Sequence, residues 1–431
     1  MGGRCLTVTE HEPLAITEDP SPTTLSVEEA ERVARIGELR PGFCRRGYRS
    51  VQFAQYCGIV GLGARALEIL PKVDRDDDSG QCRDVLLRLL KHSGRSRAFQ
   101  HLPVGQSLRK ANLLDIFIAA FLDALGRLVR SGLMRRYHEQ EEDLTCVRGQ
   151  IAAARQFALL ANRGDVVACR FDELTIDNVW NRAVKYALRL VQPRIASTDV
   201  HRRWTELWAV FVDVSDLPVG VEVLDRLTID RQAGRYEEVM QWVRWIVGDL
   251  SPTLRAGDNS APALLFDMNV LFESSVAWAM RRDLVMRGFD VHEQVRGYHL
   301  AHVQGSAHRE IPLCPDVVIK RGGMIAAIAD TKWKLVGIDA NGYLCPEATD
   351  VYQMHAYASA TGCERLALIY PRHSDLASSR ETVYELPAVG TRRPLLRIEL
   401  VDVHADPFDV SGAVRGILAT PEGLAEPAFS A

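Results

Sequence analysis

The chain has 431 residues, of which 47% are hydrophobic and 25% are charged, which is enough for two or three domains with full hydrophobic cores. Its formal net charge of −4 argues against strong binding of DNA by this chain alone, although local basic patches can still bind phosphate. Its nine cysteines include no C-x-x-C pair, so we expect reduced thiols and neither a disulfide framework nor a zinc site.

The first 166 residues predict an N-terminal α+β domain. Residues 1–26 are rich in Pro, Thr and Glu and indicate a loose arm or an edge strand, and Ser26 can cap the helix that follows. The segment 51–73 alternates like a hairpin, and the segment from Lys110 to Leu133 predicts a long helix. Because charged residues interrupt that helix, we expect it to be buried and not to span a membrane. The amino terminus lacks the basic start and apolar run of a signal peptide, so we expect a cytoplasmic protein.

Residues 167–260 predict a helical connecting region. Asp177 and Asn181 fall on one helical face within the segment 171–195, where we expect them to cap or brace the structure and not to catalyse a reaction. No G-x-x-x-x-G-K-[ST] sequence occurs in the chain, so we expect it to bind no nucleotide through a P-loop. Any GTP or ATP hydrolysis that drives its action then belongs to another polypeptide.

Residues 261–412 contain the candidate catalytic core. Apolar residues recur at helical spacing from Leu265 to Ala279, and Glu273 lies among them, so this helix can supply one carboxylate to a site. A solvated helix residue is the alternative interpretation of Glu273. Two short apolar strands follow at Val317–Lys320 and Met324–Ala329, and the Arg-Gly-Gly sequence between them predicts a tight antiparallel hairpin.

Three residues at the end of this hairpin have the chemistry of a metal site. Side chains alternate along a strand, so Asp330 and Lys332 point the same way while Thr331 points the other way, and Asp316 reaches them from the neighbouring strand. Two carboxylates favour Mg²⁺, with Mn²⁺ as an alternative, over zinc. Lys332 can orient or deprotonate an attacking water and offset the charge that develops on a phosphorane. A solvated ion pair on a surface hairpin is the competing interpretation.

The segment downstream predicts a helix and then a strand. The helix opens at Asp350, places Gln353 and Tyr357 four residues apart on one face, and closes at Gly362. The strand is the apolar segment 365–371. A helix, a hairpin, a helix and a strand make an α/β core in which five polar residues can converge at one sheet edge. Those residues are Glu273, Asp316, Asp330, Lys332 and Gln353. For Gln353 and Tyr357 the alternative is a pair on the helix surface.

Histidines and basic residues lie near this candidate site in the sequence. The histidines have irregular spacing on a predicted hairpin, so we interpret them as ordinary strand residues, with contact to a DNA phosphate as the alternative for one of them; they are His292, His299, His302 and His308. The candidate phosphate-binding cations are Arg281, Arg282, Lys320, Arg321, Lys332 and Lys334.

The order of these motifs (Glu, Pro-Asp, Asp-Thr-Lys, Gln-x-x-x-Tyr) resembles the PD-(D/E)xK nuclease superfamily, in its RecB-like branch. More narrowly, the chain resembles the McrC family, the nuclease subunits of McrBC-type, 5-methylcytosine-specific restriction systems. The resemblance covers residues 50–375. Its further matching segments are GLGARALEILPKV (61–73), LTCVRGQI (144–151), FDELTIDNVWNRAVKYAL (171–188), DMNVLFE (267–273) and DVYQMHAYA (350–358).

The resemblance implies a role for each motif residue. Asp316 and Asp330 correspond to metal ligands, Glu273 to the helix carboxylate that joins them, and Lys332 to the catalytic lysine. The pair that supports them is Gln353 with Tyr357. The implied fold is a PD-(D/E)xK restriction-endonuclease-like α/β core, with helices flanking a mixed sheet.

The resemblance also implies partners. McrC-like proteins cut double-stranded, methylated DNA with Mg²⁺ in antiviral defence, assembled with an McrB-like AAA+ GTPase hexamer that uses GTP and recognises the modified base. The N-terminal domain up to residue 166 is then expected to project from the nuclease and insert into the partner ring, whereas a plain accessory subdomain is the alternative.

Two further interpretations compete with a nuclease subunit of this kind. One is a non-cutting adaptor that anchors and stimulates an AAA+ ring, and the other is a nuclease of the same fold in a different defence or repair system. The complete set of Asp316, Asp330 and Lys332 favours a nuclease. Residues 413–431 form a tail with little sequence signal, which we expect to be frayed.

Overall fold

The structure is a computed structural model, in which the chain divides into two compact units. One unit comprises Met1–Gly3 and Leu114–Pro262, and the other comprises Arg4–Leu113 and Ala263–Ala431. The described residues are 5–19, 21, 23–62, 65–74, 77–94, 97–102, 111–159, 163–228, 230–231, 233–250, 263–304, 310–405 and 408–419.

This division differs from the one expected from sequence, because Arg4–Leu113 folds with the carboxyl-terminal part and not with residues 114–166. The physical reason is a four-stranded sheet that contains strands from both parts. In the order in which they pair, its strands are β1 (Cys5–Thr9), β6 (Ala66–Leu70), β5 (Tyr56–Gly61) and β10 (Ala263–Asp267). The hairpin expected within residues 51–73 is present as β5 and β6, which pair antiparallel. The amino-terminal segment contributes β1 at the edge of this sheet. Of the two structures expected for this segment, a loose arm or an edge strand, the second is therefore present.

Smaller elements complete this part of the unit. A second sheet has the strand order β2-β4-β3, with β2 at Pro13–Ala15, β4 at Ser50–Phe53 and β3 at Cys44–Arg46. Helix α1 (Val27–Leu39) begins where Ser26 and Glu29 form a capping box, as the sequence indicated for Ser26. The other helices are α2 (Ser79–His92) and α3 (Arg97–Gln100).

The unit built from residues 114–262 is mostly helical. Its helices are α4 (Leu113–Arg130), α5 (Ala153–Leu159), α6 (Val179–Val191), α7 (Thr198–Val210), α8 (Val221–Asp225) and α9 (Glu237–Leu250). Asn181 is fully buried on α6, where its amide donates to the carbonyls of Met134 and Ile176 and its oxygen accepts from the Tyr236 hydroxyl. Asp177 accepts from the Arg182 guanidinium, which holds the pKa of that carboxyl well below its usual range. Both residues therefore brace the fold, as expected.

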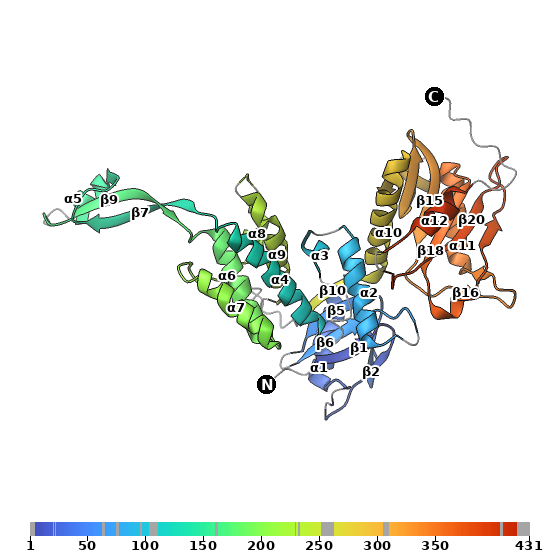
Figure 1. Cartoon of the computed structure of the whole chain (residues 1–431), viewed down its shortest axis with the longest axis horizontal. Helices are drawn as coiled ribbons and strands as arrows, with labels where there is room; N and C mark the ends of the chain where they lie inside the picture. Colours follow the sequence, from blue (N-terminus) through green and yellow to red (C-terminus); the bar gives the residue numbers. More distant parts are fainter. Residues whose placement is uncertain are drawn as a thin grey trace. The chain divides into compact units, whose positions relative to one another are not determined.

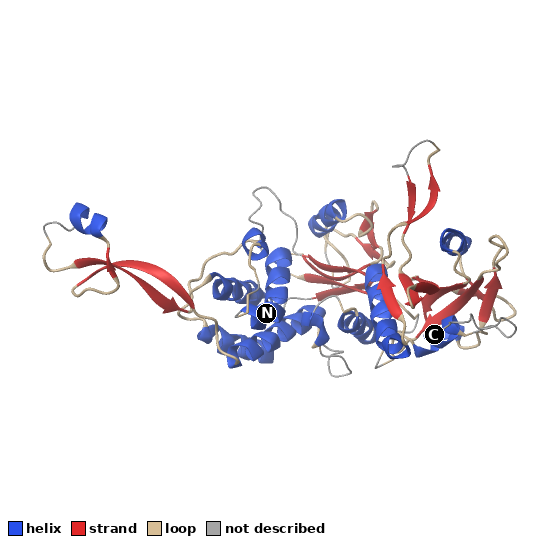
Figure 2. Ribbon diagram, turned by 90° about the horizontal axis from the view of Figure 1, so that it is seen from above, coloured by secondary structure: helices blue, strands red, loops and turns tan. Residues whose placement is uncertain are grey.

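The same unit carries an antiparallel ribbon formed by β7 (Arg136–Leu144), β8 (Gln150–Ile151) and β9 (Val167–Thr175). Within this unit the ribbon extends away from the helices, with α5 near its far end (Figures 1 and 2). The two long strands pair over their full length, from Arg136 opposite Thr175 to Leu144 opposite Val167. Tyr137 is exposed on β7, and Phe157 is exposed on α5.

The carboxyl-terminal part contains a mixed six-stranded sheet. In pairing order, its strands are β11 (Asp290–Glu293), β14 (Val317–Arg321), β15 (Met324–Thr331), β18 (Arg365–Pro371), β20 (Leu395–Val401) and β19 (Thr382–Glu385). Strands β15, β18 and β20 are parallel, and the other pairs are antiparallel. Two small hairpins lie beside this sheet, formed by β12 (Tyr298–His302) with β13 (Glu310–Leu313) and by β16 (Gly337–Ile338) with β17 (Leu344–Cys345).

Helices cover both faces of this sheet. Helix α11 (Ala348–Thr361) buries Met354, Tyr357 and Ala358 in one apolar cluster with alternate residues of β14, β15 and β18. Helices α10 (Met268–Leu284) and α12 (Ser411–Leu418) lie on the opposite face (Figures 1 and 2). The expected boundary between core and tail therefore falls inside α12, which packs on the sheet, and residues from 420 onward lie outside the described residues. Leu265, expected in a helix, lies on strand β10.

Among the described residues, no helix combines the length and apolar character needed to cross a membrane.

Gly58 allows β10 to pair with β5, so we expect Gly58→Ala to destabilise the unit. Its φ is 141°, and a Cβ atom there would lie 2.0 Å from the Leu264 carbonyl oxygen. The substitution should cost about 1–3 kcal/mol and lower the Tm by several degrees. Gly132→Ala is the matched control, because Gly132 also has a positive φ but no atom lies within 4 Å of its Cβ position. Equal shifts in Tm for the two variants, measured by calorimetry, would show that the β5–β10 approach is not the cause.

Candidate active site

The hairpin of β14 and β15 places Asp316 beside Asp330. Gly322 and Gly323 form its two-residue turn with φ values of 56° and 81°, a conformation that favours glycine and matches the twist of paired strands. The turn pairs Arg321 with Met324, and a β-bulge between Ile319 and Lys320 shifts the register by one residue, so that Val317 pairs with Ala329. Asp316 directly precedes Val317 and Asp330 directly follows Ala329, so the two carboxylates come from adjacent strand ends, as the sequence predicted.

The lysine directly follows strand β15, which ends at Thr331. The Lys332 Nζ atom lies 2.6 Å from Asp330 Oδ2, which confirms that these two side chains share one side of the strand. Thr331 was expected to point away from Asp316, but its backbone N–H and its hydroxyl both donate to Asp316 Oδ2, at 2.9 Å and 3.0 Å. The expectation failed because Thr331 is the last residue of the strand, where both its backbone and its side chain can reach the neighbouring chain segment.

Helix α11 contributes Gln353 and Tyr357, and both belong to the site. Gln353 Oε1 accepts from Lys332 Nζ at 2.9 Å, while its amide nitrogen lies 3.3 Å from Asp330 Oδ1 and 2.7 Å from the Tyr357 hydroxyl. The Tyr357 hydroxyl can donate to Asp330 Oδ1 at 3.3 Å or to the Cys314 carbonyl at 3.2 Å. Tyr357 is buried, which rules out a pair of residues on the helix surface.

Glu273 lies farther from this group than expected. It is buried on α10, the helix that Asp267 caps, and its Oε1 atom accepts from Gln294 Nε2 at 2.6 Å. Its charge still acts on Asp316, because it contributes to the raised pKa of that carboxyl. Among the described residues, however, the ligand atoms of Glu273, Asp316 and Asp330 do not gather within 4.8 Å of one another.

Burial is the main electrostatic feature of the two aspartates. Burial, together with the nearby Glu273 carboxylate, raises the pKa of Asp316 to about 6. Burial, together with the charge of Asp316, raises the pKa of Asp330 to about 6, although the Lys332 ammonium acts in the opposite direction. Both carboxyls therefore lose their protons less readily than usual, even though the Lys332 ammonium is close by. A divalent cation bound between them would stabilise their ionised forms.

The side chains present fit a hard divalent cation. Asp330 Oδ2 is buried, and among the described residues its partner is the Lys332 ammonium, whose Nζ atom lies 2.6 Å away. Asp316 directs Oδ2 to Thr331. Mg²⁺ is commonly bound by one or two carboxylates together with water, so Asp316 and Asp330 suffice as direct ligands. Glu273, which is held by Gln294, then fits a contact through water better than direct coordination.

Two residues near the site were not found from sequence. Gln294 has a φ of 48°, which is uncommon for any residue other than glycine, and it links Glu273 to Cys314, whose thiol donates to Gln294 Oε1 at 3.2 Å. Asp350, at the start of α11, is buried, accepts from the Tyr370 hydroxyl and pairs with Lys334 at 2.9 Å. No local pattern marks Gln294, whereas the first-turn position of Asp350 on a predicted helix was a usable signal.

The candidate phosphate-binding cations are partly engaged inside the protein. Arg281 pairs with Glu293 at 2.7 Å, and Arg282 lies over the Trp278 ring. Arg321 lies over the Phe289 ring, and Lys334 pairs with Asp350. Of the histidines, His292, His299 and His302 lie on strands β11 and β12, as expected, and His308 lies outside the described residues.

The fold and the site define a mixed α/β protein with a buried carboxylate and lysine centre at the end of a sheet hairpin. By its sequence the chain belongs to the family described as McrBC 5-methylcytosine restriction system component, which matches residues 51–371. No curated protein matches the chain in sequence.

Two solved structures from Thermococcus gammatolerans have a similar fold. In a refined half-complex from a tetradecameric assembly of McrB AAA+ hexamers with bound McrC, one chain is 16% identical with a TM-score of 0.70, and the match covers 92% of this chain and 94% of that chain. In a cryo-EM structure of the McrBC complex, the corresponding values are 18%, 0.51, 65% and 88%. At these identities the likeness establishes the fold.

We expect binding of Mg²⁺ to strengthen as the pH rises through about 6. Protons compete with the cation for Asp316 and Asp330, both of which have a pKa of about 6, so the affinity should fall by about tenfold or more per pH unit below that value and level off above pH 7. Isothermal titration of the full chain from pH 5 to pH 8 measures this. Asp330→Asn should remove the binding, and Asp290→Ala, an exposed carboxylate on the neighbouring strand β11, should not. An affinity that stays flat from pH 5 to pH 8 would contradict the assignment of these ligands.

Proposed function

We propose that this chain is the Mg²⁺-dependent DNA endonuclease subunit of an McrBC-like restriction system, with a PD-(D/E)xK core formed by α10, the β14–β15 hairpin, α11 and β18. The observation that carries the proposal is the pair formed by the buried Asp330 and the partly buried Asp316, with Lys332 held between Asp330 and Gln353. Burial of two carboxylates that repel one another is unfavourable for the fold alone, and such groups cluster at functional sites.

In this mechanism Asp316 and Asp330 would hold Mg²⁺, or Mn²⁺, which would lower the pKa of a bound water and offset the charge of the phosphate. Lys332 Nζ, fixed by Asp330 Oδ2 at 2.6 Å and Gln353 Oε1 at 2.9 Å, orients the attacking water and stabilises the negative charge that develops on the phosphate. Tyr357 keeps its proton, because burial raises the pKa of its hydroxyl, and it can therefore donate to Asp330.

Glu273 has an indirect role in the same mechanism. Its carboxylate accepts a hydrogen bond from Gln294 at 2.6 Å. The negative charge of this carboxylate contributes to the raised pKa of Asp316. The same carboxylate would accept hydrogen bonds from water bound to the cation and would not bind the cation directly. In this way Glu273 would help to hold that water beside Asp316.

The proposed partners are double-stranded, methylated DNA and an McrB-like AAA+ GTPase hexamer. Family membership and the fold likeness to structures that contain McrB hexamers with bound McrC support the ring partner. GTP is used by that partner, and the complex acts in the cytoplasm, where a restriction system meets foreign DNA.

We place the contact with the ring in the amino-terminal portion, residues 1–166, and particularly on the ribbon that β7 forms with β9, which continues to Thr175. Tyr137 and Phe157 are exposed there, and a paired ribbon can reach into a ring without unfolding. Ion pairs of Arg170 with Glu139 and Glu141 and the contact of Arg148 with the Phe171 ring stiffen it.

We expect Asp330→Ala to abolish DNA cleavage, with a loss of at least about 10³-fold, because it removes a metal ligand. The same variant should still stimulate GTP hydrolysis by the partner. Cleavage of methylated and unmethylated plasmid with Mg²⁺ measures the first effect, with and without the GTPase and GTP, and phosphate release measures the second. Asp290→Ala, an exposed carboxylate on the same sheet, is the matched control.

The proposal is supported if methylated plasmid is cut only when wild-type protein, the GTPase and GTP are all present, and unmethylated plasmid is not cut. Undiminished cleavage by Asp330→Ala would contradict the site. If wild type and Asp330→Ala both stimulate the GTPase and neither cleaves, the chain is an adaptor and not a nuclease.

Lys332→Ala should lower kcat by about 10²- to 10³-fold while leaving the affinity for Mg²⁺ within a few-fold of wild type, because the lysine contacts the water and the phosphate. Gln353→Ala should lower kcat by a smaller factor, since Lys332 keeps its ion pair with Asp330. Single-turnover cleavage and metal titration separate the two quantities. A large loss of Mg²⁺ binding in Lys332→Ala would show that the lysine acts by organising the ligands.

A further inference from the structure

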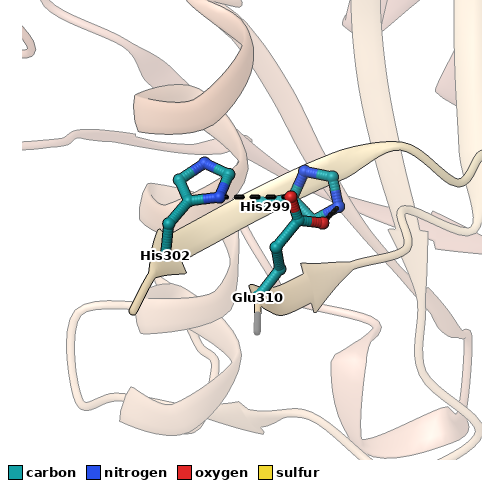
Figure 3. A group of neighbouring side chains, drawn as sticks. All are labelled: His299, His302 and Glu310. Atoms are coloured by element: carbon teal, nitrogen blue, oxygen red, sulfur yellow. Dashed lines mark ion pairs between the residues drawn. The ribbon is translucent and has the colours of Figure 1, made fainter. Parts of the chain in front are cut away.

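A second group of metal-ligating side chains lies on the β12–β13 hairpin. The His299 Nε2 atom lies 2.5 Å from Glu310 Oε2, and the His302 Nδ1 atom lies 3.2 Å from Glu310 Oε1. Figure 3 shows both imidazoles directed at the one carboxylate. Each of these three residues offers one possible metal-ligand atom, and the three atoms all lie within 4.8 Å of one another. Among the described residues, His299, His302 and Glu310 are the group with this property.

A β-bulge brings the two histidines to the same side of the hairpin. Residues three apart on a regular strand point to opposite faces. Here His299 pairs with Pro312 and Ala301 pairs with Ile311, so Leu300 is an extra residue opposite the partner strand. The extra residue restores a common direction to His299 and His302, on the side where Glu310 lies opposite His302.

The donor set distinguishes this group from the aspartate centre. Two imidazole nitrogens and one carboxylate oxygen are typical ligands of Zn²⁺ in sites that keep a fourth position open, whereas Mg²⁺ prefers oxygen ligands alone. Ligand atoms around a tetrahedral zinc ion lie about 3.3 Å apart. The separation of His302 and Glu310 already fits this value, and the contact between His299 and Glu310 needs to widen by less than about 1 Å.

Ion pairing alone gives a weaker account of the group. The three side chains are 27%, 61% and 33% exposed, for His299, His302 and Glu310 in turn. Ion pairs at such exposure contribute about 0–1 kcal/mol, which offers little reason to direct two histidines at one glutamate through a bulge. Partial exposure does allow a cation to enter and the carboxylate to shift.

We propose that His299, His302 and Glu310 form a site for a divalent transition metal of the zinc type, separate from the Asp316 and Asp330 centre. The metal clips β12 to β13 across the connection at residues 303–309. Strand β13 ends at Leu313, and the next residue, Cys314, accepts a hydrogen bond from Tyr357 through its carbonyl. The clip therefore orders the segment that leads directly into Asp316. This inference does not depend on the proposed nuclease function.

The test is a titration of the metal-free full chain with Co²⁺, which reports its ligands by visible absorption. The parent protein is the Asp316→Asn, Asp330→Asn double variant, so that the oxygen centre takes up no cobalt. We expect about one equivalent of Co²⁺ with a visible absorption band, and displacement of that band by Zn²⁺. In the same parent, His302→Ala should lose this binding, and His292→Ala, which alters an exposed histidine outside the group, should keep it.

Because His302 is largely exposed, its substitution leaves the fold intact. Hydrogen exchange then gives a second readout, since Zn²⁺ should slow exchange of the β12 and β13 amides in the parent and not in His302→Ala. Absence of bound cobalt in the parent, or equal binding by the parent and His302→Ala, would overturn the proposal.

Discussion

Two carboxylates that repel one another, the buried Asp330 and the partly buried Asp316, lie at the end of one hairpin, and the rest of the carboxyl-terminal core depends on this constraint. Removing a charge from water costs several kcal/mol unless a partner offsets it. Lys332 supplies the offset for Asp330 at 2.6 Å, and the Thr331 amide and hydroxyl supply it for Asp316. Even so, both aspartates have a pKa raised to about 6, so the compensation is incomplete without a cation.

The packing that keeps this unfavourable group in place also supplies its hydrogen bonds. Tyr357 belongs to the apolar cluster between α11 and the sheet, and the same side chain reaches Asp330 with its hydroxyl. Gln353, one turn earlier on α11, holds Lys332. A shift of α11 on the sheet would therefore disturb the core and the site together. Precise placement of the lysine is a consequence of core packing, and the proposed reaction depends on such placement.

Local patterns were sufficient for the elements that carry the site, and insufficient for their long-range pairing. The glycine turn, the apolar strands and the helix that ends at Gly362 each follow from a short stretch of sequence. Leu265 was placed in a helix because its spacing fits α10, but pairing of β10 with β5 makes it a strand residue. That pairing joins residues about 200 positions apart, which no local period reveals. The positive φ of Gln294 and the bulge at Leu300 are likewise set by neighbours in space.

The chemistry of the two ligand groups explains how they can coexist within a short stretch of chain. Asp316 and Asp330 offer oxygen atoms to a hard cation, and His299 and His302 offer nitrogen atoms that such a cation binds weakly. A zinc ion at the proposed site on the β12–β13 hairpin would therefore not compete with Mg²⁺ for the aspartates. The connection between them is covalent and short, because β13 ends at Leu313 and Asp316 follows three residues later. Order imposed on the hairpin reaches Asp316 through Cys314, whose carbonyl and thiol are both held by residues of the aspartate centre and its surroundings.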